Sequence, residues 1–174
     1  MTRNDRIKKQ ADGIKLKIEA VVRHIEKVQS NCLMLGKKLI EGGEFELGKQ
    51  LIASGYKHDN SKFHGIEFGA MTGEAPTIKD DKKIKLKFAV HHHNLTNLHH
   101  PEAWGGIEHM PRVALAEMVS DWKARSEEFG TNLREWISDT AMKRFGFKEN
   151  DEVDKQVMEF VNLLCEKPFS EIKS

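Results

Sequence analysis

His58 and Asp59 are adjacent and supply two donor types from which protein metal sites are built. An imidazole nitrogen with a carboxylate oxygen suits zinc, manganese, iron, cobalt or nickel. Lys62 follows four residues after His58, where one helical turn would bring its ammonium to the same face. We therefore expect His58 and Asp59 to bind a divalent transition metal, and Lys62 to hold an oxyanion near it.

His24 has neighbours that predict an inward-facing ring. Val21 and Val28 lie about one turn to either side of it in an amphipathic segment. A polar ring placed there needs a partner. That partner is either a metal or, in the simpler alternative, a backbone carbonyl of the core.

Asp121 is the fourth candidate ligand. Met118 lies one turn before it on the same predicted helical face, and a carboxylate beside an apolar side chain needs a cation or water. The alternative is an ion pair with Arg125 at the i+4 spacing. Glu117, one turn earlier, is a second acidic candidate for the same role.

Histidines cluster between His91 and His100, where five of the nine in the chain occur. If one metal binds, His93, His99 or His100 could protonate a leaving group or hold a phosphate, because imidazole titrates near neutral pH. The alternative is that the cluster caps a helix end and adds surface polarity.

The order His24, His58-Asp59, Asp121 resembles the H…HD…D ligand signature of the HD-domain superfamily, an all-helical fold of metal-dependent phosphohydrolases. The resemblance covers residues 20–130. In some branches two further histidines bind a second metal, and by this resemblance His92 and His99 are the first choices. Their separation of seven residues departs from the better-known dinuclear families, in which a whole helix lies between the two.

Two other motifs refine the resemblance. HDNSK looks like the HDxxK of dinuclear branches, which include HD-GYP phosphodiesterases and di-iron oxygenases typified by myo-inositol oxygenase. The pattern HHxxxNxHH followed by EMxxDW resembles an uncharacterised HD-like family of bacteria and phages. The matching residues are His92, His93, Asn97, His99, His100, Glu117, Met118, Asp121 and Trp122.

The resemblance implies a metal-dependent phosphohydrolase that cleaves a nucleotide or another small phosphoester through a metal-activated hydroxide. One or two ions would bind His24, His58, Asp59, His92, His99 and Asp121, and the catalytic residues would be Asp59, Lys62, His93 and His100. Trp104, Trp122 and Phe63 lie near these positions in sequence and could stack on a base. The alternatives are an HD-type di-iron oxygenase and a non-catalytic protein that binds a nucleotide or a metal.

Periodic apolar residues predict the helices that must position these side chains. They indicate helices over residues 14–39, 45–54, 81–93, 110–128, 131–144 and 151–166. His58 and Asp59 lie at an element boundary, with a loop over 69–80 and irregular chain over 94–106. No segment alternates like a strand. We expect an all-α, single-domain bundle of the HD-domain type over 1–174, with six or seven helices and with helices from 131–168 packing on the metal-site core.

Composition limits the partners. The 174 residues are 39% hydrophobic and 32% charged, which is typical of a folded domain. The formal net charge of +1 provides no general attraction to duplex nucleic acid or to a membrane. No apolar run approaches the roughly 20 residues of a membrane span, and no signal-peptide pattern is present. We expect a cytoplasmic protein with a small phosphorylated ligand.

Overall fold

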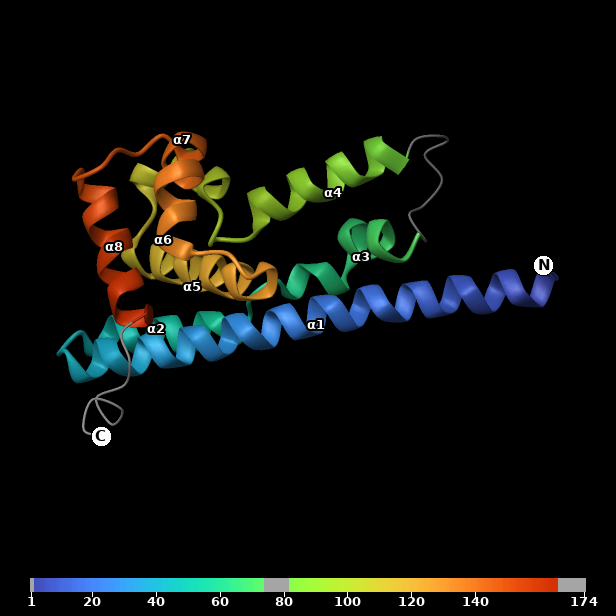
Figure 1. Ribbon diagram of the computed structural model, residues 1–174, viewed down its shortest axis with the longest axis horizontal. Coiled ribbons are helices and arrows are strands. Elements are labelled where there is room, and N and C mark those ends of the chain that lie inside the picture. The colour runs from blue at the N-terminus through green and yellow to red at the C-terminus, as the bar shows by residue number, and fades with distance from the viewer. Residues whose placement is uncertain (1, 74–81, 166–174) are drawn as a thin grey trace.

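The computed structural model describes residues 2–73 and 82–165, which form helices joined by short connections, with no strand among them (Figure 1). The helices are α1 (Arg3–Glu41), α2 (Phe45–Gly55), α3 (Gly65–Thr72), α4 (Lys82–Thr96), α5 (Arg112–Phe129), α6 (Leu133–Trp136), α7 (Met142–Phe145) and α8 (Glu152–Cys165). A π-helical stretch, Ile137–Ala141, joins α6 to α7, so these three form one continuous segment. With that segment counted once, the described part of the chain has seven α-helical segments, and the predicted all-α fold is confirmed.

Three short 3-10 helices lie in the connections close to the His58-Asp59 pair and to His99 and His100. They span Asn60–Phe63, Pro101–Trp104 and Ile107–His109. The first follows the His58-Asp59 pair directly, so this pair does lie at an element boundary. The second follows His99 and His100, which therefore lie in the connection between α4 and α5.

α1 is longer than the sequence pattern indicates. It begins at Arg3, because Thr2 caps it: the Asp5 amide donates to Thr2 Oγ1 at 3.2 Å, and the Thr2 amide donates to Asp5 Oδ2 at 2.8 Å. Its first turns are mostly exposed, and Figure 1 shows this end reaching past α3. Exposed turns have no apolar periodicity, which explains why the pattern begins only at Ile14.

Two other boundaries differ from the predicted ones. The loop expected over residues 69–80 starts later, because 69–72 continue α3, and residues 74–80 lie outside the described chain. α4 continues to Thr96, three residues beyond the predicted end. Residues 94–96, expected to be irregular, are therefore helical, which fixes the directions of the preceding histidine side chains.

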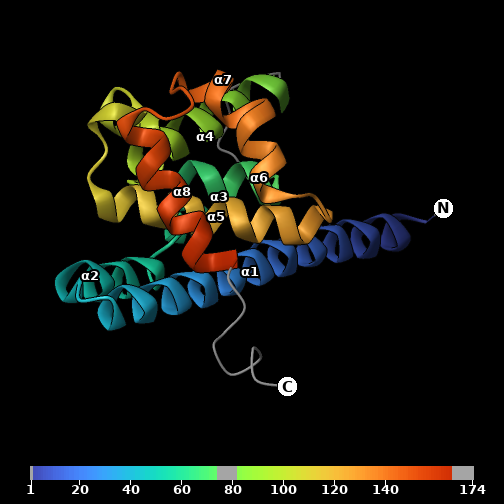
Figure 2. The same ribbon diagram turned by 60° about the vertical axis from the view of Figure 1, so that its left-hand side comes forward.

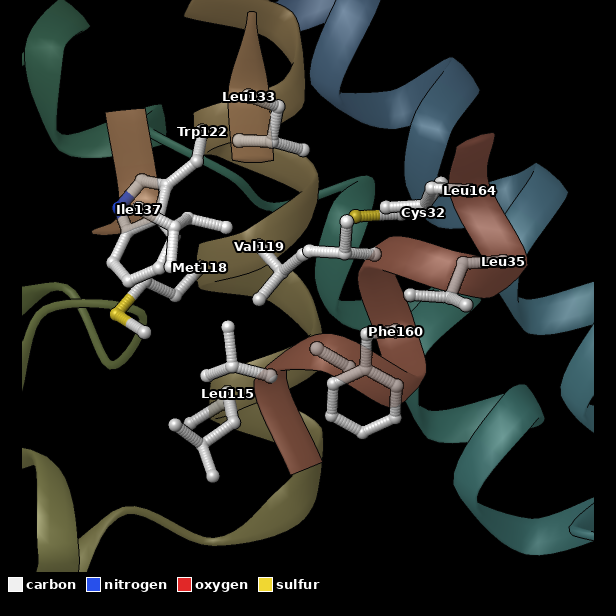
Figure 3. Close-up of a cluster of buried hydrophobic side chains, with 14 of the residues drawn as sticks. Cys32, Leu35, Leu115, Met118, Val119, Trp122, Leu133, Ile137, Phe160 and Leu164 are labelled. Atoms are coloured by element: carbon white, nitrogen blue, oxygen red, sulfur yellow. The ribbon is translucent and has the colours of Figure 1, made fainter. Parts of the chain in front are cut away.

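The apolar core lies where α1, α5 and α8 meet, with α2 packed along α1 (Figures 1 and 2). Leu35 from α1, Leu115 and Val119 from α5, and Phe160 from α8 are all buried, and Figure 3 shows them in one cluster. α8 thus packs on α1 and α5, the helices that carry His24 and Asp121.

Small residues bring α2 against α1. A Cβ added at Gly36 would lie 2.8 Å from the Gly48 carbonyl oxygen, and one added at Gly55 would lie 2.6 Å from Cys32 Cβ. Larger side chains at these positions would force the two helices apart. Because His58 follows Gly55 by three residues, this close packing sets the position of the His58-Asp59 pair relative to α1.

α4 is held mainly through its C-terminal half. Ala89 is its buried apolar residue, whereas Ile84, Phe88 and Val90 are exposed. Polar contacts also hold this half, because His92 and His93 both meet the Glu67 carboxylate of α3.

No helix of the described residues is both long enough and apolar enough to cross a membrane.

Candidate metal centre

Asp59 occupies a turn whose backbone few residue types adopt readily. It precedes the 3-10 helix Asn60–Phe63 and has a left-handed φ of 55°. Aspartate tolerates this region better than most non-glycine residues. Its side chain is 2% exposed, so the turn delivers a carboxylate into the interior rather than to solvent.

The two oxygens of Asp59 face different sets of histidines. Oδ2 lies 3.6 Å from His58 Nε2 and 3.9 Å from His24 Nε2. Oδ1 lies 3.1 Å from His93 Nε2 and 3.5 Å from His99 Nε2. A single carboxylate therefore stands between two groups of possible ligands. Lys62 Nζ also donates to Asp59 Oδ2, from the edge of the site.

The first group consists of His24 from α1, His58 from the turn after α2 and Asp121 from α5. Their ligand atoms lie within 4.8 Å of one another. His24 Nε2 and Asp121 Oδ1 are 3.0 Å apart. Two imidazole nitrogens and a carboxylate oxygen in this spacing can hold a divalent ion.

The second group contains Asp59, His93 from α4, and His99 and His100 from the connection after α4. Their ligand atoms also lie within 4.8 Å of one another. Since Asp59 belongs to this group and its other oxygen faces the first, each group has one Asp59 oxygen directed toward it. We name the set with His24 the first group and the set with His93 the second group.

Unpartnered polar atoms concentrate at this point of the molecule. Among the described residues, eight buried side-chain nitrogen or oxygen atoms have no hydrogen-bond partner. Six of the eight belong to the two groups: His24 Nε2, His58 Nε2, His99 Nε2, His100 Nε2, Asp59 Oδ1 and Asp121 Oδ1. Three of them have an oppositely charged neighbour without a well-aligned hydrogen bond: His24 Nε2 and Asp121 Oδ1 lie 3.0 Å apart, and Asp59 Oδ1 lies 3.1 Å from His93 Nε2. Buried polar atoms normally have partners, and an ion is one of the explanations where they do not. The residues therefore fit a metal.

The sequence also matches a family model across most of its length. The model describes a family of unknown function, DUF5662, and it matches residues 14–167. The chain belongs to the DUF5662 family. A search of curated proteins and a search of solved structures each gave no match. The range matched in this DUF5662 member includes every residue of both groups.

Glutamates, of which Glu67 and Glu117 are buried, fix the rings of this DUF5662 site from behind. In each case the Nδ1 atom of a histidine meets a carboxylate while Nε2 faces Asp59. The pairs are His24 Nδ1 with Glu128 Oε1 at 2.9 Å, His58 Nδ1 with Glu117 Oε1 at 3.0 Å, and His93 Nδ1 with Glu67 Oε2 at 2.8 Å. Carboxylates in this position set the tautomer and orientation of metal-binding histidines.

The structure brings together most of the residues predicted from the sequence. His24, His58, Asp59, His99 and Asp121, predicted as ligands, all lie in the two groups. His93 and His100, predicted to transfer protons or hold phosphate, are also among the possible ligands. Lys62 reaches Asp59 from a 3-10 turn rather than from the α-helical turn expected.

His92 is the one predicted ligand that the structure does not bring into either group. Its side chain is 48% exposed, and its Nδ1 lies 2.8 Å from Glu67 Oε1. Successive residues of an α-helix point about 100° apart, so His92 and His93 cannot both face the centre. Because α4 continues through this stretch, His93 points inward and His92 lies at the edge.

The simpler alternatives for His24 and Asp121 do not describe their surroundings. His24 Nδ1 meets the carboxylate of Glu128 rather than a backbone carbonyl. Arg125, the expected i+4 partner of Asp121, pairs instead with Glu128 at 3.0 Å. Asp121 is therefore left facing His24.

Glu67 and Glu128 are site residues that sequence reasoning missed. Glu67 is the single charged residue of α3 and Glu128 lies in the charged last turns of α5, and neither has a spacing that separates it from an ordinary solvent-facing glutamate. Glu117 was singled out as a substitute for Asp121, but its carboxylate supports His58 instead. No local sequence signal identifies such partners, because their role depends on which histidine lies opposite.

The charges of the centre favour ionised carboxylates. Burial opposes ionisation of Asp59, but His93, His58 and Lys62 outweigh it and hold its pKa well below the usual range. The pKa of Asp121 is lowered despite burial, chiefly by His24. Both groups thus present the deprotonated oxygens that metal binding requires.

The histidines of the second group differ from one another. Burial, followed by the neighbouring His99 and His93, lowers the pKa of His100 to about 3. Burial also acts against protonation of His93, but Asp59 and Glu67 outweigh it and raise its pKa. The His100 ring is accordingly neutral at pH 7, with a nitrogen lone pair available to a cation.

A cavity of about 480 Å³ opens onto the centre. Asp59, Lys62, His93, His100 and Asp121 line it, so a ligand in the cavity reaches both groups. Its wall also contains aromatic side chains: the Trp122 ring stacks on Phe145 with centroids 5.5 Å apart and meets Trp136 edge-on with centroids 5.1 Å apart. Trp104 and Phe63, the other predicted stacking residues, do not line this cavity.

Proposed function

We propose that this chain is a metal-dependent phosphohydrolase of the HD-domain type that acts on a nucleotide or another small phosphoester. The observation that carries the proposal is the Asp59 carboxylate, which lies buried between two groups of donors whose inward atoms lack hydrogen-bond partners. The donors are nitrogen and oxygen atoms, which suit manganese, iron, cobalt, nickel or zinc.

Two ions are proposed, one in each group, with Asp59 as a shared ligand. Divalent metals in such sites supply hydroxide near neutral pH and polarise a phosphoryl oxygen. The first group would use His24, His58 and Asp121, and the second would use His93, His99 and His100. In this assignment His93 and His100 bind metal rather than transfer a proton.

Among the lysines and arginines that the structure describes, Lys62 is the one that contacts Asp59 at the metal centre. Its ammonium contacts Asp59 Oδ2, and it lines the cavity at the metal centre. A fixed positive charge at the point where negative charge develops stabilises a transition state more than a ground state. We assign Lys62 to the phosphoryl oxygens and Asp59 to orienting the nucleophile.

The cavity wall favours a substrate with a flat ring and more than one negative charge. Trp122 and Trp136 offer aromatic surface. Arg144 lines the wall with its guanidinium 4.9 Å from the Phe145 ring centroid, and among the described residues it has no carboxylate partner. An unpaired arginine beside aromatic rings suits a phosphate joined to a base, as in a nucleotide.

Phosphate release tests the proposal directly. The purified chain would be stripped with a chelator, reloaded with manganese, cobalt or ferrous iron, and incubated with nucleotides, simple phosphomonoesters and phosphodiesters. We expect metal-dependent phosphate or phosphomonoester release from at least one of them. Ferrous-iron-dependent oxygen consumption without phosphate release would support the di-iron oxygenase instead, and tight nucleotide binding without turnover would support a binding protein.

The adjacent histidines of α4 provide a matched pair of variants. His93→Ala is expected to lose one of two bound ions, because His93 Nε2 faces Asp59 Oδ1 at 3.1 Å. His92→Ala is expected to keep both, because that ring lies at the edge of the site. Elemental analysis after gel filtration gives the number of ions per chain. An equal loss in both variants would show that the second group is wrongly assigned.

Arg144→Gln tests the second anionic contact. We expect KM for a nucleotide to rise about fivefold to tenfold, with a smaller change in kcat. A charge-assisted hydrogen bond contributes about 1.5–3 kcal/mol, and the expected effect lies below this range because Arg144 is solvent-exposed. Lys143→Gln, which removes the neighbouring exposed charge outside the cavity wall, is the control. Equal KM values in the two variants would remove Arg144 from substrate recognition.

A further inference from the structure

Glu117 contacts a histidine of each group through the same oxygen atom. Its Oε1 lies 3.0 Å from His58 Nδ1 and 3.4 Å from His99 Nδ1. The two rings lie beside each other, with centroids 4.2 Å apart. His58 belongs to the first group and His99 to the second, so this carboxylate reaches both from behind.

The other two glutamates each reach a single group. Glu128 contacts His24 of the first group, and Glu67 contacts His93 of the second. Among the residues described, Glu117 is thus the carboxylate that both groups share on the side away from Asp59. Its side chain is 8% exposed, so solvent does not weaken these contacts much.

A carboxylate that accepts from Nδ1–H decides what the opposite nitrogen can do. With the proton on Nδ1, the Nε2 lone pair of the ring is free for a cation. Both His58 Nε2 and His99 Nε2 are buried without a hydrogen-bond partner. One Glu117 oxygen is therefore in position to present both lone pairs to the centre.

We propose that Glu117 is a positioning residue that serves both metal groups at once, by fixing the tautomer and orientation of one histidine ligand in each. This inference rests on the metal centre of the proposed function but not on the reaction. It makes the two groups depend on one outer carboxylate, whereas Glu128 and Glu67 each affect their own group alone.

Three matched variants test the assignment: Glu117→Gln, Glu128→Gln and Glu67→Gln. Each keeps the shape of the side chain and removes its charge. Glu117 lines a second cavity of about 500 Å³ with His58 and His99, so the new amide has room. Calorimetric titration with zinc measures the affinity of each site, and His24→Ala and His93→Ala identify which site is which. Circular dichroism confirms that each variant is helical.

We expect Glu117→Gln to weaken zinc binding about 10-fold to 100-fold at both sites, the usual effect of removing an outer-shell carboxylate. Glu128→Gln should weaken only the site that His24→Ala removes, and Glu67→Gln only the site that His93→Ala removes. If Glu117→Gln weakens one site or neither, the proposal is wrong. A wild-type chain that binds no zinc overturns it together with the metal centre, whereas zinc binding without any phosphate release rejects the proposed reaction alone.

A measurement on the unmodified chain keeps the proposal testable if a variant does not fold. Long-range nitrogen–proton NMR correlations of the zinc-loaded protein report which nitrogen of each histidine carries a proton. We expect His58 and His99 both to be protonated at Nδ1. Protonation at Nε2 in either ring would contradict the role assigned to Glu117.

Discussion

Asp59→Asn is expected to lower phosphate release by more than about 10³-fold, at least the effect of removing one preorganised electrostatic group from a transition state. Asp59 is the carboxylate in the second group, whose other members are histidines, and its second oxygen faces His58 and His24 of the first. An amide at this position supplies no negative charge to either group. The variant should therefore bind fewer ions as well as turn over more slowly.

Two measurements separate this effect from a general loss of structure. Metal content by elemental analysis and helicity by circular dichroism should show a folded protein with at most one ion. Asp12→Asn, on the exposed part of α1, is the control and should keep both the ions and the activity. A variant at position 59 that retains two ions and wild-type turnover would remove the bridging carboxylate from the proposal.

Metal addition is expected to stabilise the chelator-treated chain by about 5 kcal/mol when both sites are filled at about 100 times their dissociation constants, because each site then contributes about 2.7 kcal/mol. For a chain of this size, that corresponds to a rise in Tm of about 10–20 °C. The physical reason is the set of buried atoms without hydrogen-bond partners, whose desolvation an ion would offset.

Differential scanning calorimetry with added manganese, cobalt or zinc measures this change. His24→Ala should show about half the rise, because it removes a ligand of the first group alone. Magnesium, which prefers oxygen ligands, should produce little change and is the control ion. A Tm that does not respond to any transition metal would contradict both groups.

The positions of the first-group ligands could be predicted because they lie in strongly patterned helices. His24 has Val21 and Val28 one turn away on either side, and such periodicity indicates an inward direction before any partner is known. Asp121 shares its helical face with the buried Met118. The all-α fold follows from the same periodicity.

The second group was harder to predict, because the α4 histidine that points toward the centre depends on where α4 ends. Asn94 and Thr96 carry polar side chains that favour neither helix nor loop strongly, and His92 rather than His93 was predicted as the ligand. The structure continues the helix through Thr96, which turns His93 inward. The wrongly predicted end of α4 therefore accompanied the wrong choice of His92 as a ligand in place of His93.

The supporting glutamates could not be predicted at all from local sequence. Glu67 and His93 are separated by 26 residues, and Glu128 and His24 by 104. Contacts at such separations depend on tertiary packing rather than on helix pattern.

The exposed start of α1 was missed for a different reason. The capping box formed by Thr2 and Asp5 begins the helix, but no periodic apolar residues follow it in the first turns.

The wide separation of these residues along the chain means that the centre has no local precursor. The segment that contains all of its ligands and outer carboxylates runs from His24 to Glu128, and its members come from α1, the turn after α2, α3, α4, the connection after α4, and α5. A fragment that lacks α1 or α5 would lose the first group even if its remaining helices formed. Two fragments produced by one cut between α1 and α5 should each lack metal affinity and regain it only when they reassemble. Ion binding would then report directly on the reassembly of these two fragments.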